Sequence, residues 1–201
     1  MYSEQDEIAG WRRDLDHSAV GAIERFLAWL GRHWLAVMVG FVGLIVLGGF
    51  TNTILDAVGL TGAGAFNFRA YSLICTQIPG HSYWPFGFQM AMCQRDLAIF
   101  ASFFIGGIAF AVTGRRWPQL GWKWYLLMLV PIAIDGGTQL FGWRHSTWWL
   151  RSLTGGLFGV ANAWMILPTM QWAMKGVVET IKSESAQKPG ETAPEEQKAA
   201  E

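Results

Sequence analysis

The sequence predicts an all-α membrane protein: a four-helix transmembrane bundle with both termini cytoplasmic and one long outward loop. Of the 201 residues, 52% are hydrophobic and 14% are aromatic. Only 15% are charged, whereas ordinary soluble domains carry about 25%. Four apolar segments approach the roughly 20 residues that a helix needs to cross a bilayer. Fifteen Lys and Arg balance fifteen Asp and Glu, and this neutral balance excludes nucleic-acid binding.

The predicted organisation has three parts. Residues 1–33 form a cytoplasmic amphipathic helix, because apolar residues recur at helical spacing on one face from Ile23 to Leu30. Residues 34–178 form the membrane domain. Residues 179–201 form a disordered cytoplasmic tail, because they are dominated by Glu, Lys, Ala, Gln and Pro and cannot bury enough apolar surface to fold.

Four spans are predicted within the membrane domain, at about 34–55, 91–112, 122–140 and 150–174. The first is the strongest apolar run of the chain. The second has an apolar stretch too short to cross a bilayer, so its helix must begin earlier and include charged residues. Span two therefore starts with charge.

Lysine and arginine counts predict the orientation of these spans. Segments 1–33, 113–123 and 175–201 hold eleven of the fifteen Lys and Arg. Cytoplasmic flanks retain positive charge during insertion, which places these segments inside. The protein is therefore expected to be a multi-pass protein of the cell membrane whose loop 60–92 is extracytoplasmic.

Ionisable and polar residues in and beside the spans mark a candidate ligand site, because a charge in the membrane costs several kcal/mol unless it is paired or hydrated. The candidate ligand-binding residues are Arg95, Asp135, Gln139, Arg144 and Arg151. With Asp96, the set brings three arginines and two aspartates toward the outer leaflet. The excess positive charge suits a phosphate or carboxylate headgroup held by arginine. The alternative is an architectural ion pair of Asp135 that only fixes helix register.

The two cysteines of the chain, Cys75 and Cys93, both fall on the predicted outer side. A disulfide is the default outside the cytoplasm, and it would stabilise the fold by roughly 3 kcal/mol through chain entropy. A redox-active pair is the alternative, although the spacing is far from Cys-x-x-Cys. Cys75, His81, Cys93 and Asp96 could also supply four metal ligands. Their spacing matches no standard zinc pattern, so no metal site is predicted.

Two groups of residues form extended patterns. The first is Cys75-Thr76-Gln77, Pro79, His81-Ser82-Tyr83 and Cys93-Gln94-Arg95-Asp96. The second is Asp135-Gly136, Gln139, Gly142-Trp143-Arg144-His145-Ser146, Leu150-Arg151 and Thr154-Gly155. Over residues 70–160 the chain resembles the family of predicted integral membrane proteins catalogued as domain of unknown function 2085. Thr76 and Asp96 stand where that family often has His and Cys, which weakens the metal or multi-thiol site that the resemblance implies. The family has no assigned activity.

Three functions are consistent with these features. The leading hypothesis is a small integral membrane protein that binds or transports an anionic lipid or isoprenoid headgroup in an outer-leaflet Arg/Asp pocket. The alternatives are a thiol or quinone redox enzyme that uses Cys75 and Cys93, and an accessory subunit of a larger membrane complex. No nucleophile-elbow, zincin, P-loop or dinucleotide motif occurs in the sequence, so neither a reaction nor a cofactor is identified. Membrane lipids are the expected partners.

Overall fold

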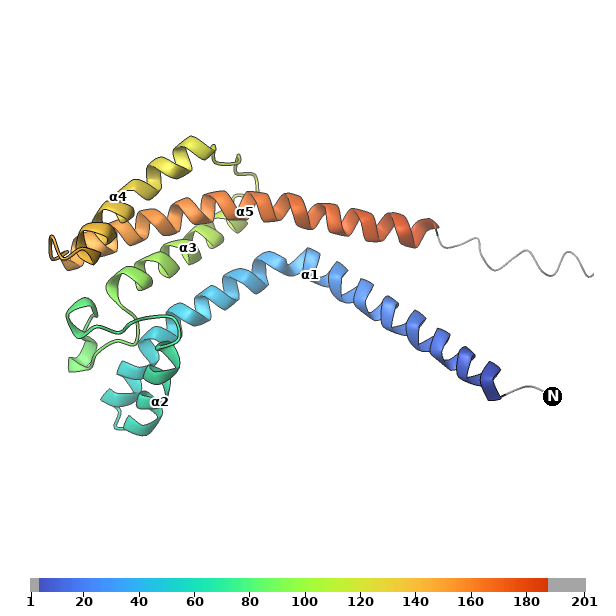
Figure 1. Cartoon of the computed structure of the whole chain (residues 1–201), viewed down its shortest axis with the longest axis horizontal. Helices are drawn as coiled ribbons and strands as arrows, with labels where there is room; N and C mark the ends of the chain where they lie inside the picture. Colours follow the sequence, from blue (N-terminus) through green and yellow to red (C-terminus); the bar gives the residue numbers. More distant parts are fainter. Residues whose placement is uncertain (1–3, 188–201) are drawn as a thin grey trace, which may run out of the picture. The chain divides into compact units, whose positions relative to one another are not determined.

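The computed structural model describes the backbone of residues 4–187 and the side chains of residues 19–183. The described chain is helical, which confirms the all-α class. Its helices are α1 (Glu4–Ala57), α2 (Thr61–Tyr71), α3 (Gln94–Val112), α4 (Trp122–Leu140) and α5 (Trp148–Gln187) (Figure 1). Two 3-10 turns, η1 (Pro79–His81) and η2 (Pro85–Gly87), lie between α2 and α3. In the described residues, extended backbone pairs only at an isolated bridge between Ser82 and Cys93.

Three helical segments within the described chain are long and apolar enough to cross a membrane. They are Ala19–Ala57 in α1, Gln94–Val112 in α3 and Trp148–Ser183 in α5. Helix α4 has the bounds of the predicted third span, but it is not one of the three. The reason is its composition, because Lys123, Asp135 and Gln139 lower the hydropathy of a helix of only 19 residues.

The end helices extend past the predicted boundaries. Helix α1 is continuous from Glu4 to Ala57, so the predicted amphipathic helix and the first span form one element. Helix α5 continues to Gln187, into the predicted tail, and the rest of that tail lies outside the described residues. Lys, Glu, Ala and Gln are good helix formers, which explains why this polar segment extends α5. The predicted loop 60–92 contains a helix of its own, α2.

The chain divides into two compact units. Residues 4–34 and 171–187 belong to the first unit, and residues 35–170 form the second. In the first unit, Gly31 allows the helices to approach closely, since a Cβ there would lie 2.6 Å from a methyl carbon of Val178. The second unit contains the remaining helices and the loops that carry the candidate site.

Glycines set the packing of α3 against α5. A Cβ on Gly155 would lie 2.7 Å from the carbonyl oxygen of Arg95, and a Cβ on Gly159 would overlap the carbonyl of Ile99. These two glycines form a small-residue seam of the kind that lets helices approach closely. Because Gly155 faces Arg95 and Gly159 faces Ile99, α3 and α5 run parallel.

Helix α4 runs antiparallel to α5. Asp135, near the end of α4, lies 3.5 Å from the hydroxyl of Thr154 in the early part of α5. Tyr125, near the start of α4, donates a hydrogen bond to Asn162 further along α5, at 3.2 Å. The chain therefore passes along α3, returns along α4 and passes again along α5, as Figure 1 shows.

The second part of α1 completes the second unit. Gly107 of α3 lies against Val39, and Gly43 of α1 lies against the ring of Phe104. The later residue of α1, Gly43, contacts the earlier residue of α3, Phe104, so these two helices are antiparallel. In the second unit, α1, α3, α4 and α5 form a bundle with alternating direction along the chain.

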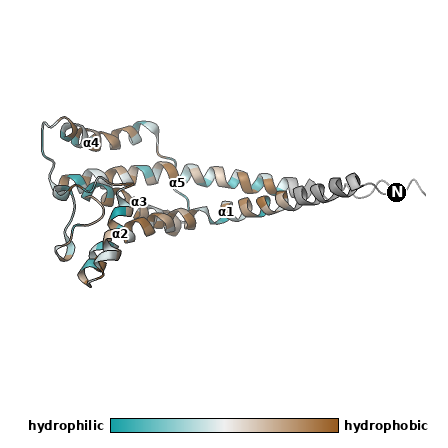
Figure 2. Cartoon of the chain, turned by 60° about the horizontal axis from the view of Figure 1, so that its bottom comes forward, coloured by the Kyte–Doolittle hydropathy of each residue, from teal (hydrophilic) through white to brown (hydrophobic). Residues whose placement is uncertain are grey.

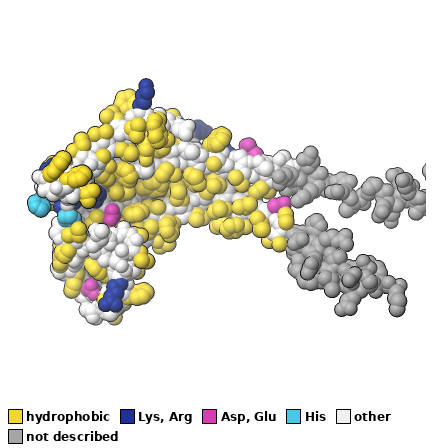
Figure 3. Space-filling view, in the orientation of Figure 1, with side chains coloured by type: hydrophobic (Ala, Val, Ile, Leu, Met, Phe, Trp, Pro, Cys, Tyr) yellow, Lys and Arg dark blue, Asp and Glu magenta, His cyan; other side chains and the backbone are white. Residues whose placement is uncertain are grey.

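Apolar side chains cover much of the face of the second unit that Figure 3 shows, and Figure 2 colours much of its helices as hydrophobic. The exposed ones include Phe41, Leu44 and Leu47 of α1, Ile105 and Val112 of α3, and Leu127 and Ile134 of α4. A surface of this kind is unfavourable in water and favourable in hydrocarbon. Helices are also the elements that satisfy their own backbone hydrogen bonds inside a bilayer.

We expect Gly159→Ala to lower the free energy of unfolding by roughly 1–3 kcal/mol, the usual cost of overpacking. The added Cβ would overlap the backbone carbonyl of Ile99, which cannot rotate away. Gly156→Ala is the matched control, because nothing lies within 4 Å of a Cβ at that position. Thermal unfolding in a mild detergent measures both. Equal melting temperatures for the two variants would contradict the packing of α3 on α5.

Candidate functional site

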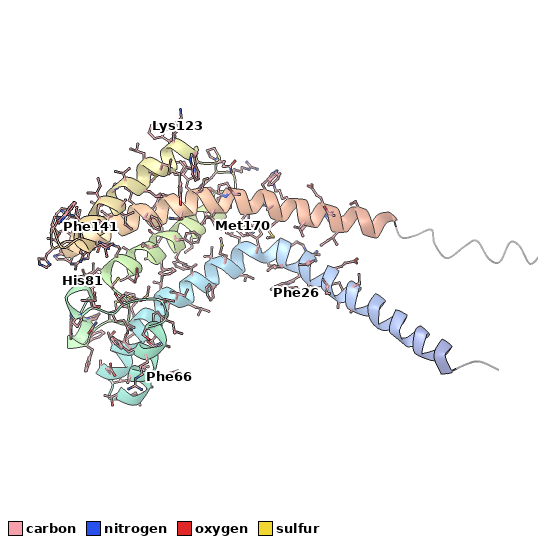
Figure 4. All side chains as sticks on the ribbon, viewed as in Figure 1. Phe26, Phe66, His81, Lys123, Phe141 and Met170 are labelled. Carbon is pink, nitrogen blue, oxygen red and sulfur yellow. The ribbon has the colours of Figure 1, made fainter. Side chains whose placement is uncertain are left out.

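Side-chain amides hold the irregular loop 72–93 in place. Asn52 of α1 is 1% exposed. Its amide nitrogen donates to the carbonyl of Gln89 at 2.7 Å, and its amide oxygen accepts from the N–H of Ala91 at 3.0 Å. Gln77 donates to the carbonyl of Ala91 at 3.0 Å. These bonds satisfy backbone groups that no regular element satisfies, and they fix the loop that carries His81 (Figure 4).

The carboxylate of Asp135 is the centre of the charged cluster. Its side chain is 2% exposed, and its two oxygens accept hydrogen bonds from different arginines. Arg95 Nη2 lies 2.5 Å from Oδ2, and Arg144 Nη2 lies 2.7 Å from Oδ1. The three residues come from α3, α4 and the loop before α5. The predicted ion pair of Asp135 is therefore present and involves two arginines.

Gln139, in the last turn of α4, connects this cluster to His81. Its amide oxygen accepts from Arg95 Nη2 at 3.2 Å, so its amide nitrogen faces His81 Nε2 at 3.0 Å. Because the amide nitrogen donates, the imidazole Nε2 must accept, which assigns the neutral tautomer with the proton on Nδ1. Burial first, then the charges of Arg151, Arg95 and His145, lower the pKa of His81. Both observations favour a neutral His81.

Arg151, in the first turn of α5, is 5% exposed and forms no salt bridge with a carboxylate among the described residues. Its Nη1 donates to the carbonyl of Gly80 and to the side-chain oxygen of Gln94, both at 3.1 Å. Its Nε is buried and has no acceptor in the described part of the chain, and the same is true of Arg95 Nε. An unsatisfied buried donor costs about 1–3 kcal/mol, and more if it is charged.

Both of these arginines line one cavity of about 310 Å³. Its walls come from the loop 72–93, the start of α3 and the first turn of α5. The lining residues are Ile74, Cys75, Thr76, His81, Cys93, Arg95, Asp96 and Arg151. We call this cavity the arginine pocket. Two guanidinium groups, each with a buried Nε–H that has no acceptor in the described chain, suit an anionic ligand, and Asp96 adds one carboxylate to the wall.

The five predicted ligand-binding residues have two different positions. Arg95 and Arg151 line the arginine pocket. Asp135, Gln139 and Arg144 are not part of its lining; they form the network that orients Arg95. The sequence placed all five in one cluster of residues from three spans, but helix spacing does not show which of these groups pair with one another.

Cys75 and Cys93 are free cysteines in the structure, so the predicted disulfide is not present. Each sulfur accepts a backbone hydrogen bond instead. Cys93 is the N-cap of α3, and its sulfur lies 3.4 Å from the N–H nitrogen of Asp96. The Cys75 sulfur lies 3.2 Å from the N–H nitrogen of Cys93. These bonds hold the sulfurs in positions other than those of a disulfide.

The two thiols have opposite pKa shifts. A hydrogen bond from the Cys93 thiol, helped by the backbone N–H groups of Gln77 and Cys93, lowers the pKa of Cys75. The same contact with Cys75, together with burial, raises the pKa of Cys93. Cys75 is therefore the cysteine of the pair that more readily carries the negative charge.

Two residues of the site were not predicted. Gln94 is buried and joins Arg151 to the carbonyl of Ser82. Thr154 contacts the carboxylate of Asp135. Both lie within the sequence patterns quoted above, but their chemistry alone does not separate them from the many surface glutamines and threonines of proteins.

Apolar helices with a buried charged cluster define a helical membrane protein, and comparison with known proteins agrees. Residues 75–165 match the model of the family described as predicted membrane protein (DUF2085). The resemblance predicted from the sequence is confirmed over residues 75–165. The matched segment begins at Cys75 and includes every residue of the arginine pocket except Ile74.

A relative occurs in Methanocaldococcus jannaschii, where the protein is described as uncharacterized. It is 39% identical over 106 residues, which cover 50% of this chain and 66% of the relative. This chain therefore spans only 66% of the relative's length. No solved structure matches the chain.

We expect Asp135→Ala to lower the free energy of unfolding by roughly 3–5 kcal/mol, because it leaves buried charge without a partner. Arg144→Ala is expected to cost about 1 kcal/mol or less, since the Arg144 side chain is 46% exposed. Thermal unfolding of both variants in one detergent measures the difference. Losses of the same size would show that Asp135 does not anchor the cluster.

His81 is expected to make stability depend on pH. Its pKa is lowered in the folded chain, so the unfolded chain binds the proton more readily as the pH falls below about 6.5. Stability contributed by neutral His81 is present above that pH and is lost below it. His81→Gln should therefore lose less stability than the wild type between roughly pH 7 and pH 5. His145→Gln is the control, and melting temperatures that fall equally in both variants would contradict the expectation.

Proposed function

We propose that the arginine pocket binds the anionic headgroup of a membrane amphiphile, with a phospholipid or an isoprenoid phosphate as the chemical class. One observation carries the proposal: Arg95 and Arg151 each keep a buried Nε–H without an acceptor in the described chain, and both line the same cavity. A phosphate oxygen accepts such charge-assisted bonds, which are about twice as strong as neutral ones.

The charge balance also favours an anion. Arg95 and Arg144 pair with Asp135, the one buried carboxylate among the described residues, and Arg151 adds a third guanidinium that has no carboxylate partner there. Asp96 contributes a second carboxylate at the pocket wall. One positive charge remains in excess, in a region of low dielectric where an unpaired charge is costly. Binding a headgroup would remove that cost.

The surroundings favour an amphiphile over a small soluble anion. Trp143, Trp148 and Trp149 are exposed, and they lie just before and within the first turn of α5, where Arg151 also lies. Tryptophan gathers at the level of lipid headgroups. A ligand that reaches Arg151 from this level would leave its hydrocarbon tail on the apolar outer face of the bundle.

The helix directions support four crossings of the membrane. Helices α3 and α5 run parallel, so the chain must return between them, and α4 makes that return. Its 19 residues span about 28 Å at 1.5 Å per residue, close to the roughly 30 Å hydrocarbon thickness. Pairing of Asp135 with two arginines reduces the cost of placing α4 in the membrane. Four crossings leave both termini on one side of the membrane. The excess of Lys and Arg in segments 1–33, 113–123 and 175–201 favours the cytoplasmic side for them, and segment 60–92 then lies outside.

Arg151→Lys tests this proposal, because lysine keeps the charge but has no second fixed donor. We expect the wild-type chain, extracted in mild detergent, to retain a phosphate-bearing amphiphile in native mass spectrometry. Affinity should fall roughly tenfold or more in the variant, since each charge-assisted bond contributes about 1.5–3 kcal/mol. Arg69→Lys is the matched control, because Arg69 is an exposed arginine of α2 outside the pocket.

One further outcome decides the ligand class, and another would contradict the proposal. If inorganic phosphate displaces the retained molecule as well as a phospholipid does, the headgroup alone accounts for binding. An identical set of retained lipids in wild type and Arg151→Lys would contradict the proposal.

A further inference from the structure

We infer that the arginine pocket also contains a site for a divalent transition metal of the zinc type, formed by Cys75, Cys93 and Asp96. The two sulfurs and a carboxylate oxygen of Asp96 all lie within 4.8 Å of one another. In a tetrahedral zinc site with bonds of about 2.0–2.3 Å, neighbouring ligand atoms are about 3.3–3.8 Å apart. Small side-chain rotations therefore bring the three atoms to ligand distance.

The fold brings these ligands together from two segments. Cys75 follows α2, whereas Cys93 caps α3 and Asp96 lies in the first turn of that helix. Residues three apart at the start of a helix share a face, so Cys93 and Asp96 can reach one point. The bridge between Ser82 and Cys93 ties the loop to the start of α3. The donor atoms are thus positioned by backbone pairing and capping.

Each of the two sulfurs accepts a hydrogen bond from a backbone N–H, which leaves sulfur lone pairs directed at donors rather than at a second sulfur. The N–H nitrogen of Cys93 lies 3.2 Å from the Cys75 sulfur, and that of Asp96 lies 3.4 Å from the Cys93 sulfur. The thiolate is the form that binds metal, and backbone donors aimed at a sulfur stabilise this form. Two thiolates and a carboxylate in such proximity would repel one another without a cation between them.

The donor types select the kind of metal. Soft thiolates favour zinc and its neighbours over Mg²⁺ or Ca²⁺, which prefer oxygen alone. Two thiolates, one carboxylate and a divalent cation carry one net negative charge, and Arg95 and Arg151 in the same pocket can balance it. Three protein ligands leave one tetrahedral position for water or an anion. His81 lines the pocket but stands outside the three-residue group.

This inference goes beyond anion binding, because its occupant is a cation held by other side chains. The linear spacing of the three residues matches no standard zinc pattern, so the sequence alone did not predict the site. Only the return of the loop 72–93 to the start of α3 brings the two sulfurs close together.

The test uses the full-length chain, purified in mild detergent with a phosphine reductant and stripped of metal by a chelator. Titration with Co²⁺ is expected to saturate at one ion per chain. It should produce sulfur-to-cobalt charge-transfer absorption and the intense visible bands of tetrahedral cobalt, and Zn²⁺ should abolish both. Cysteines with a purely structural role would not give these spectra. The titration contains no lipid or phosphate, so its result does not depend on the proposed anion.

Matched variants locate the ligands. Cys93→Ser should weaken the charge-transfer band, because one of two thiolates is lost. Asp96→Asn should keep the band and lower the metal affinity by roughly tenfold or more, a loss that even outer partners of a metal site can cause. Asp56→Asn makes the same change in the second unit, outside the pocket, and should behave as the wild type.

Two results would overturn the inference. One is a reduced wild-type chain that gives no charge-transfer band with Co²⁺. The other is a band that Cys93→Ser leaves unchanged. The wild-type spectrum alone shows whether the chain binds Co²⁺ through sulfur. The inference can therefore be tested even if a variant does not fold.

Discussion

The structure of the second unit depends on the buried carboxylate of Asp135. A buried charge is tolerated only with partners, and Asp135 has two, Arg95 from α3 and Arg144 from the loop before α5. Because the partners come from different elements, the pairing fixes the register of three segments at once. It also explains how α4 can lie among apolar helices although its own hydropathy is low. The ion pairs and the glycine contacts of α5 specify the same arrangement.

The free donors of Arg95 and Arg151 follow from the way that neighbouring groups hold these two side chains. Once Asp135 and Gln139 hold the Nη2 end of Arg95, the Nε–H of that guanidinium is left without an acceptor in the described chain. Arg151 reaches a similar state by another route, since Gly80 and Gln94 engage only its Nη1. The pocket thus combines two arginines with two thiols and a carboxylate. Such a combination can hold an anion and a soft cation in neighbouring positions.

The relation between sequence and site differs from residue to residue. Asp135 and its arginines could be found from the sequence because charges in and beside apolar segments are rare and costly, and the structure pairs Asp135 with Arg95 and Arg144. The disulfide could not be judged in this way, because whether two sulfurs bond depends on side-chain rotations that the capping of α3 decides. Nor could the roles of Arg95 and Arg144 be separated. Both are arginines that pair with Asp135, but only Arg95 lines the pocket.

The sequence by itself determined that this chain is helical and apolar, because composition and the length of apolar runs depend on residues close together along the chain. It also indicated which residues carry charge near one end of the bundle. Tertiary structure decided the rest: the parallel course of α3 and α5, the return along α4, and the meeting of Cys75 with Cys93 and Asp96. These contacts join residues distant in sequence, and local preferences carry no information about which distant segments will meet.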